Sequence, residues 1–215
     1  MYKIKKENLT ALFRAIAAEQ ELYVPVKSAG KVNFGTWSED AELDIDTLKS
    51  VKSPKDIFFP QSENLYTCER EGRKLKVEPE ALKEQRFTVF GMRACDVQGV
   101  KVLDQVFLAD PVDSFYAARR EHGTMVAIAC HEPEESCFCK VFGIDCAEPA
   151  ADVAAWFAGE ELYWKALTEK GQTLTEILSG LLTDADTEDE KKLSEEQTAI
   201  RAIVEKLPYS HLSLE

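Results

Sequence analysis

The sequence predicts an α/β (α+β) fold with a central, partly parallel sheet that contains a β-α-β crossover and is flanked by helices. Two continuous apolar runs, 87–92 and 124–130, have the composition of strands buried on both faces. Between them, 97–108 and 113–123 show helical periodicity. Strands joined through such a crossover run parallel, so these observations predict a parallel core.

The N-terminal part predicts one helix and two hairpins. Apolar side chains at helical spacing give the helix: Leu9, Leu12, Phe13, Ile16 and Ala17. The β-rich segments 22–27 and 31–37 predict a first hairpin, and 65–70 with 73–79 predict a second. Pro25 indicates an edge position, because proline cannot donate to a strand ladder.

The crossover and the C-terminal part contain further breaks and elements. Asp110-Pro111 separates the two crossover helices. After the second core strand, the pattern predicts a helix over 151–159, a strand over 162–168 and a helix over 171–183. A final helix is expected over 190–206, behind an acidic run.

Composition and charge narrow the classes of partner. The chain has 215 residues, 45% of them hydrophobic, and a net charge of -13. That charge argues against nucleic acid and anionic membranes, which require clustered Lys and Arg. The N-terminus lacks the apolar core of a secretory signal and no segment reaches transmembrane length, so we expect a cytoplasmic protein. In that reducing compartment, six cysteines indicate metal binding, catalysis or burial rather than disulfides.

Four cysteines are expected to meet at one edge of the sheet. Cys95 follows the first core strand and Cys130 ends the second, and the carboxyl ends of parallel strands open on the same edge. The loop after the second strand then supplies Cys137 and Cys139. Four thiolates suit a [4Fe–4S] cluster or a structural zinc ion.

The spacing of these cysteines favours the cluster. Structural zinc sites usually contain paired C-x₂₋₄-C motifs, whereas this chain has one Cys-x-Cys and two distant single cysteines. Buried free thiols are the remaining alternative, but Cys137 and Cys139 flank Phe138 in a polar loop. We therefore predict that Cys95, Cys130, Cys137 and Cys139 bind the cluster.

Each of the remaining candidate residues could have either a functional role or an ordinary structural one. Arg93 and Lys140 either offset cluster charge or are ordinary solvated charges. Asp96 is expected to cap the following helix. His122 and His131 are not expected to bind metal.

Two cysteines and three large aromatic residues complete the set. Cys68, in a predicted strand, is expected to face the core, and Cys146 is close enough in sequence to the cysteine loop to act as a substitute ligand. Trp156, Tyr163 and Trp164 are expected to pack in a core or interface rather than to carry electrons.

Four segments resemble a known family, the iron–sulfur beta subunits of cytoplasmic sulfhydrogenases and the A subunit of anaerobic sulfite reductase. They are FFPQSENLY (58–66), FGMRACDVQGVKVLDQVFL (90–108), DPVDSFYAARRE (110–121) and ACHEPEESCFCKVFGID (130–145). The resemblance implies a [4Fe–4S] electron-transfer subunit, with Cys95, Cys130, Cys137 and Cys139 as the matching ligands. Its implied partners are a flavin subunit that reacts with NAD(P)H and a catalytic subunit.

The sequence departs from that family in one respect. Family members continue into a ferredoxin-like domain with two Cys-x₂-Cys-x₂-Cys-x₃-Cys-Pro runs, which this sequence does not contain. We expect either an excised N-terminal domain or a short relative that obtains its next cluster from a partner. The chain 1–215 is read as a single iron–sulfur-binding domain, with an α+β part over 1–84 and a cluster-binding core plus C-terminal helices over 85–215.

Two other functions remain open at this point. Segment 91–99 contains glycines but not the G-x-G-x-x-G order, so it does not predict a dinucleotide site. The resemblance also extends to the beta subunits of deazaflavin-reducing hydrogenases, which implies a flavin on this chain or on a partner. The other alternative is a zinc-stabilised interaction module.

Overall fold

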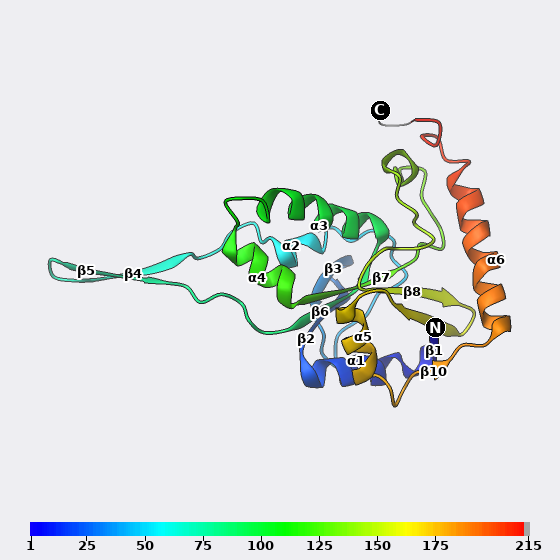
Figure 1. The fold of residues 1–215 in the computed structure, drawn as a ribbon, viewed down its shortest axis with the longest axis horizontal. Coiled ribbons are helices and arrows are strands. Elements are labelled where there is room, and N and C mark those ends of the chain that lie inside the picture. The colour runs from blue at the N-terminus through cyan, green and yellow to red at the C-terminus, as the bar shows by residue number, and fades with distance from the viewer. Residues whose placement is uncertain (213–215) are drawn as a thin grey trace.

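The computed structural model describes residues 1–212 and has the predicted mixed α/β architecture (Figure 1). Eight strands form one sheet in the order β10-β1-β9-β8-β7-β6-β2-β3, and two more form a separate hairpin. The sheet strands are β1 (Tyr2–Lys5), β2 (Glu21–Ser28), β3 (Lys31–Thr36), β6 (Phe87–Met92), β7 (Gly123–Ile128), β8 (Val153–Ala158), β9 (Glu161–Ala166) and β10 (Thr183–Asp184). The hairpin strands are β4 (Tyr66–Glu71) and β5 (Lys74–Pro79). The helices are α1 (Leu9–Glu19), α2 (Lys55–Phe58), α3 (Ala94–Phe107), α4 (Ser114–His122), α5 (Glu169–Ile177) and α6 (Thr187–Val204).

The predicted parallel core is confirmed and is larger than the crossover alone. β6 pairs in parallel with β2 on one side and β7 on the other, and β7 pairs in parallel with β8. All residues of β6 and β7 are buried, as their continuous apolar sequences predicted. Because β2 and β6 share this sheet, segments 1–84 and 85–215 contribute to one layer.

Helices cover both faces of the sheet, which gives three layers (Figure 1). On one face, α1 and α5 pack Phe13, Ile16 and Leu174 against β-strand residues such as Phe90. On the other face, α2, α3 and α4 contribute Phe58, Val97, Val100 and Tyr116 to a second core cluster. The buried sheet therefore presents its strand ends, rather than its faces, to loops and solvent.

Two predicted elements of the sheet are wrong. Residues 151–159 form β8 rather than a helix, because this short apolar run pairs with β7 and β9 and becomes buried between them. A short Ala-rich run does not distinguish helix from strand by periodicity. Pro25 is not at the sheet edge, since β2 lies between β3 and β6, but the pairing of β2 with β6 stops at Tyr23, so the proline interrupts no bond there.

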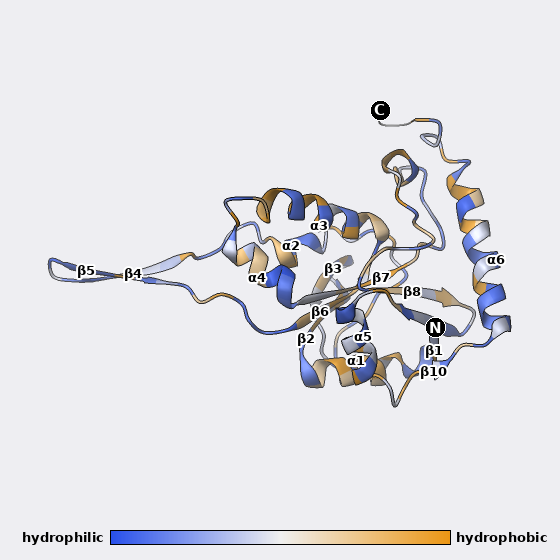
Figure 2. Ribbon diagram, viewed as in Figure 1, coloured by the Kyte–Doolittle hydropathy of each residue, from blue (hydrophilic) through white to orange (hydrophobic). Residues whose placement is uncertain are grey.

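The β4–β5 hairpin projects away from the body of the molecule (Figure 1). Every residue of both strands is exposed, and Figure 2 shows that the hairpin is largely hydrophilic. Cys68 lies in β4 and is exposed, so the expectation that it faces the core is wrong. The hairpin has no second layer to pack against, and its alternating residues therefore all meet solvent.

Helix α6 carries apolar and polar residues (Figure 2) and packs Leu193 against a face of the sheet, in a cluster with Trp156 of β8 and Tyr163 of β9. It begins in the acidic run, where the Asp186 carboxylate accepts hydrogen bonds from the N–H groups of Glu188 and Asp189 at 2.9 and 3.0 Å. Its buried residues are Leu193 and Ile200. Within residues 1–212, no helix has the length and apolar content required to cross a bilayer.

Candidate functional site

The carboxyl ends of β6 and β7 place the first two predicted cysteines. Cys95 is the second residue of α3, and Cys130 comes two residues after β7. The strands pair in parallel from Phe87 with Gly123 to Met92 with Ala127, with one shift of register between Phe90 and Met92, so both cysteines emerge at the same edge. The Asp96 carboxylate accepts a hydrogen bond from the Arg93 N–H at 3.0 Å, which confirms that Asp96 caps α3.

The loop between β7 and β8 folds back and places three more cysteines, Cys137, Cys139 and Cys146, at this edge. The Cys130 N–H donates to the Cys146 carbonyl at 2.9 Å, and the Ile144 N–H donates to the Cys139 carbonyl at the same distance. Gly143 adopts a left-handed backbone with φ of 64° and allows the chain to turn back after Cys139. Cys95, Cys130, Cys137, Cys139 and Cys146 are called the cysteine site below.

The thiols of the cysteine site form a hydrogen-bonded network. Cys139 accepts from Cys146 and from Cys95, and these bonds lower the pKa of Cys139 to about 3. Cys130 also accepts from Cys146, which lowers its pKa, with the nearby Arg93 charge acting in the same direction. The donors respond oppositely: the hydrogen bond to Cys139 and burial raise the pKa of Cys95. These contacts make Cys139 and Cys130 easier to deprotonate than an ordinary cysteine.

The four predicted ligands are brought together, at different depths. Cys130 and Cys139 are buried and Cys137 is half-buried. Cys95 lies at the surface, and its thiol is hydrogen-bonded to Cys139. Burial raises the pKa of Cys137, while the charge of Lys49 opposes this shift. Cys137 is close enough to interact electrostatically with Cys139 and Cys130. The site thus opens to solvent on the side of Cys95 and Cys137.

Two basic residues influence the cysteine site, and the sequence indicated only one of them. The Arg93 guanidinium is buried and donates to the Ile45 and Thr47 carbonyls at 2.8 and 3.2 Å. Lys49 interacts electrostatically with Cys137 and Cys95 and donates to Glu134 at 2.7 Å. Lys49 lies far from the cysteine motifs in sequence, so spacing arguments could not identify it.

Other candidate side chains lie outside the site or are already paired. Lys140 is exposed and forms an ion pair with Glu205, so its charge is largely compensated. His131 is exposed. Trp156, Tyr163 and Trp164 are buried in the cores, as expected, and the Trp156 indole donates to the Ala147 carbonyl at 2.7 Å.

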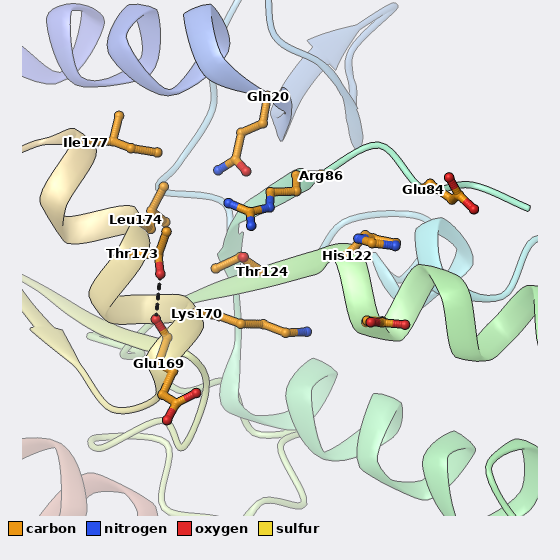
Figure 3. Close-up of a pocket in the computed structure, with 11 residues that line it drawn as sticks. Gln20, Glu84, Arg86, His122, Thr124, Glu169, Lys170, Thr173, Leu174 and Ile177 are labelled. Carbon is orange, nitrogen blue, oxygen red and sulfur yellow. Dashed lines mark hydrogen bonds between the residues drawn. The ribbon is translucent and has the colours of Figure 1, made fainter.

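A second concave region lies at the opposite, amino ends of the parallel strands. It is a cavity of about 370 Å³ (Figure 3), lined by residues of α4 and α5, by Thr124 of β7, by Gln20 just after α1 and by the segment that precedes β6. Both acidic and basic side chains line it, including Arg86, Glu121, His122 and Lys170. Burial lowers the pKa of Lys170, whose ammonium donates to the Arg120 and Gly123 carbonyls.

The donors of the cysteine site suit a soft metal centre, although the thiols contact one another in this structure. Among residues 1–212, no three His, Cys, Asp or Glu side chains are spaced to hold a single metal ion. Thiols are weak hydrogen-bond donors and acceptors, so these buried groups satisfy each other poorly. Thiolate sulfur is the ligand that iron–sulfur clusters and zinc prefer. The residues therefore fit such a group by the chemistry of their donor atoms.

Comparison with known proteins gives one informative relative. Sulfhydrogenase 2 subunit beta of Pyrococcus furiosus is 28% identical over 151 residues, which cover 70% of this chain and 43% of the relative. The matched stretch thus spans less than half of that protein. No protein-family model matches the chain. The resemblance to sulfhydrogenase beta subunits that the sequence motifs carry is thus confirmed as a sequence similarity over 70% of this chain.

Proposed function

We propose that the chain is an electron-transfer module that carries one [4Fe–4S] cluster on Cys95, Cys130, Cys137 and Cys139. The observation that supports this most strongly is the convergence of cysteines from two strand ends and one loop at a single edge. The relative belongs, by its name, to a hydrogenase, which is a redox enzyme. When bound, the cluster would supply reversible one-electron transfer.

The protein's own groups would tune and shield this cluster. The buried Arg93 guanidinium places positive charge beside Cys130, which favours the more negative, reduced form of the site. Cys130 and Cys139 lie beneath Ile144 of the loop and Ile200 of α6, which exclude water from that side. The half-buried Cys137 and the surface Cys95 leave the other side accessible. Electrons would enter or leave on this open side.

The proposed partners are other redox subunits, namely one that reacts with flavin or NAD(P)H and one that is catalytic. Large apolar side chains of the cysteine loop are exposed: Phe138 is 43% and Phe142 59% exposed. Phe138 also stacks on Tyr209 with ring centroids 4.4 Å apart. Exposed aromatic residues of this kind favour a protein interface. The assembly is of the hydrogenase or sulfite/sulfur reductase type, in the cytoplasm.

A panel of single substitutions tests the ligand assignment. Cys95, Cys130, Cys137 and Cys139 are each replaced by Ser, and Cys68→Ser serves as the control because Cys68 is exposed on the distant hairpin. We expect each of the four variants to lose iron and visible absorbance after anaerobic reconstitution, and the control to keep both. Full iron content in two or more of the four would contradict the assignment.

The same preparations separate the proposal from its alternatives. Stoichiometric zinc in a colourless wild-type protein would replace the electron-transfer function with that of a zinc-stabilised module. A yellow cofactor released on denaturation would instead indicate a flavin-binding subunit.

A further inference from the structure

The cavity at the amino ends of β6 and β7 lies on one face of the sheet. Thr88 of β6 and Thr124 of β7 are paired across the two strands. Side chains alternate along a strand, so these threonines lie on the same face as Phe90 and Val126, which pack in the core cluster that contains α1 and α5 residues. The cavity is thus enclosed by strand starts and by the helices on that face (Figure 3).

The two threonines differ in their hydrogen bonds. The Thr88 hydroxyl accepts from the Gln20 amide at 2.6 Å. Thr124 is only 7% exposed and lines the cavity, and Figure 3 shows no hydrogen bond from its hydroxyl to another lining residue. Because nearly buried polar groups normally have partners, this hydroxyl is suited to bind a molecule in the cavity.

Arg86 adds an unpaired positive charge at the same place. Figure 3 shows its guanidinium between Gln20 and Thr124, turned toward α5. Arg119 and Arg120 of α4 both form ion pairs with carboxylates, whereas Arg86 has no ion-pair partner within residues 1–212. A guanidinium and a hydroxyl that face one cavity are suitable donors for a carboxylate, which an arginine can bind through two parallel hydrogen bonds.

The other charged residues restrict the ligand to a single negative charge. The Lys170 ammonium donates to the Arg120 and Gly123 carbonyls at 2.5 and 3.0 Å, which leaves one of its three N–H groups available. Three exposed glutamates also line the cavity: Glu84, Glu121 and Glu169. Their charges disfavour anions that carry more than one negative charge.

Apolar side chains form part of the lining, and the cavity is remote from the cysteine site. Leu174 and Ile177 of α5 line it and can contact an alkyl chain. β6 and β7 have six residues each, so their two ends lie about 20 Å apart at roughly 3.3 Å per residue. A ligand in the cavity would therefore not contact the cysteines.

We propose that this cavity binds a small aliphatic carboxylate, whose carboxylate group accepts hydrogen bonds from Arg86 and Thr124 while its alkyl chain contacts Leu174 and Ile177. The inference does not depend on a cluster at the cysteine site. It assigns a second site to the chain, at the strand ends opposite the first.

Titration of the whole chain with pentanoate, followed by NMR, tests the site. We expect saturable shifts of the Thr124 and Lys170 amide signals. Pentanol, which has the same chain without the charge, should bind at least about tenfold more weakly, because removal of a hydrogen bond to a charged group has an effect of this size. Inorganic phosphate should also bind more weakly than pentanoate.

Two variants and a matched control test the assigned donors. Arg86→Gln should weaken pentanoate binding about tenfold or more, and Thr124→Val, which keeps the shape but removes the hydroxyl, about threefold. Arg73→Gln, on the exposed tip of the distant hairpin, should bind pentanoate like the wild type. Urea unfolding of each variant verifies that it is folded.

Three results would overturn the inference. The first is the absence of saturable shifts with pentanoate, and the second is equal binding of pentanoate by folded Arg86→Gln and by the wild type. The third is binding of pentanol or of inorganic phosphate as tight as that of pentanoate, which would exclude recognition of a carboxylate. Each of these results leaves the iron content of the chain, and with it the proposed function, unaffected.

Discussion

The two ends of the parallel strands carry different polar side chains: nitrogen and oxygen groups at the amino ends and thiols at the carboxyl ends. At the amino ends, hard polar groups are paired with each other: the Gln20 amide donates to the Thr88 hydroxyl at 2.6 Å, and the Asp152 carboxylate accepts the Met125 N–H at 2.8 Å. At the carboxyl ends, buried thiols have mainly one another as polar partners. Among residues 1–212, no buried side-chain nitrogen or oxygen lacks a hydrogen bond.

This difference distinguishes polar groups that stabilise the fold from groups that are candidates for binding a metal centre. Amide, carboxylate and hydroxyl groups form strong hydrogen bonds, so the amino end is stable without a ligand. Sulfur forms weak hydrogen bonds, so a buried group of thiols gains much more from a soft metal centre than from its own contacts. Substitutions at the amino end should therefore change stability, and substitutions at the carboxyl end should change metal binding and redox properties.

The largest expected effect on stability is at the amino end, from Asp152→Ala. This removes the buried acceptor of the Met125 N–H and of the Thr168 hydroxyl, which donates to Asp152 at 2.7 Å. An unsatisfied buried donor costs about 1–3 kcal/mol, so we expect the free energy of unfolding to fall by about 3 kcal/mol in urea titrations. The exposed Glu84→Ala is the matched control and should change it by less than about 0.5 kcal/mol. Loss of iron from folded Asp152→Ala would contradict the view that the amino end affects stability but not metal binding.

Arg93→Gln should change both stability and redox behaviour. The variant loses the donors to the Ile45 and Thr47 carbonyls, with a cost of about 2 kcal/mol. It also removes the positive charge beside Cys130, so the midpoint potential should become more negative. Lys140→Gln is the matched control, because the Lys140 charge is exposed and already paired with Glu205. Equal shifts in the two variants would show that Arg93 has no specific effect.

A pH effect is expected at the start of α6, away from both strand ends. Hydrogen bonds from Lys3, the Asp186 N–H and Tyr163 lower the pKa of Asp189 to about 2, from an ordinary value of 3.8. A lowered pKa in the folded state stabilises the fold above the ordinary value, and this contribution is lost as the pH falls towards about 2. The stability of Asp189→Asn should therefore decline less steeply than that of the wild type between these values, as measured by urea unfolding. The same dependence of stability on pH in the variant and the wild type would contradict this role of Asp189.

The smallest effect is expected from Cys68→Ser on the exposed hairpin. The free energy of unfolding should change by less than about 0.5 kcal/mol, and iron content and midpoint potential should not change. The hairpin has no core to disturb and lies away from the cysteine site (Figure 1). A measurable loss of iron would show that the hairpin reaches the site in solution.

Features fixed by local patterns could be predicted from the sequence, and features fixed by distant contacts could not. The buried strands β6 and β7 are continuous apolar runs, and their carboxyl ends placed Cys95 and Cys130 correctly. The strand β8 was read as a helix because its pairing with β7 and β9 decides the conformation of a short Ala-rich run. The position of Lys49 near Cys137 and Cys95 depends on how a distant segment folds back, which spacing does not reveal.

The central claim is tested most directly by the metal content and visible spectrum of the wild-type chain prepared without oxygen. We predict a brown protein with about four irons and matching acid-labile sulfide per chain, whose absorbance bleaches on addition of dithionite. A colourless protein that binds neither iron nor sulfide after anaerobic reconstitution would contradict the assignment of a cluster to the cysteine site.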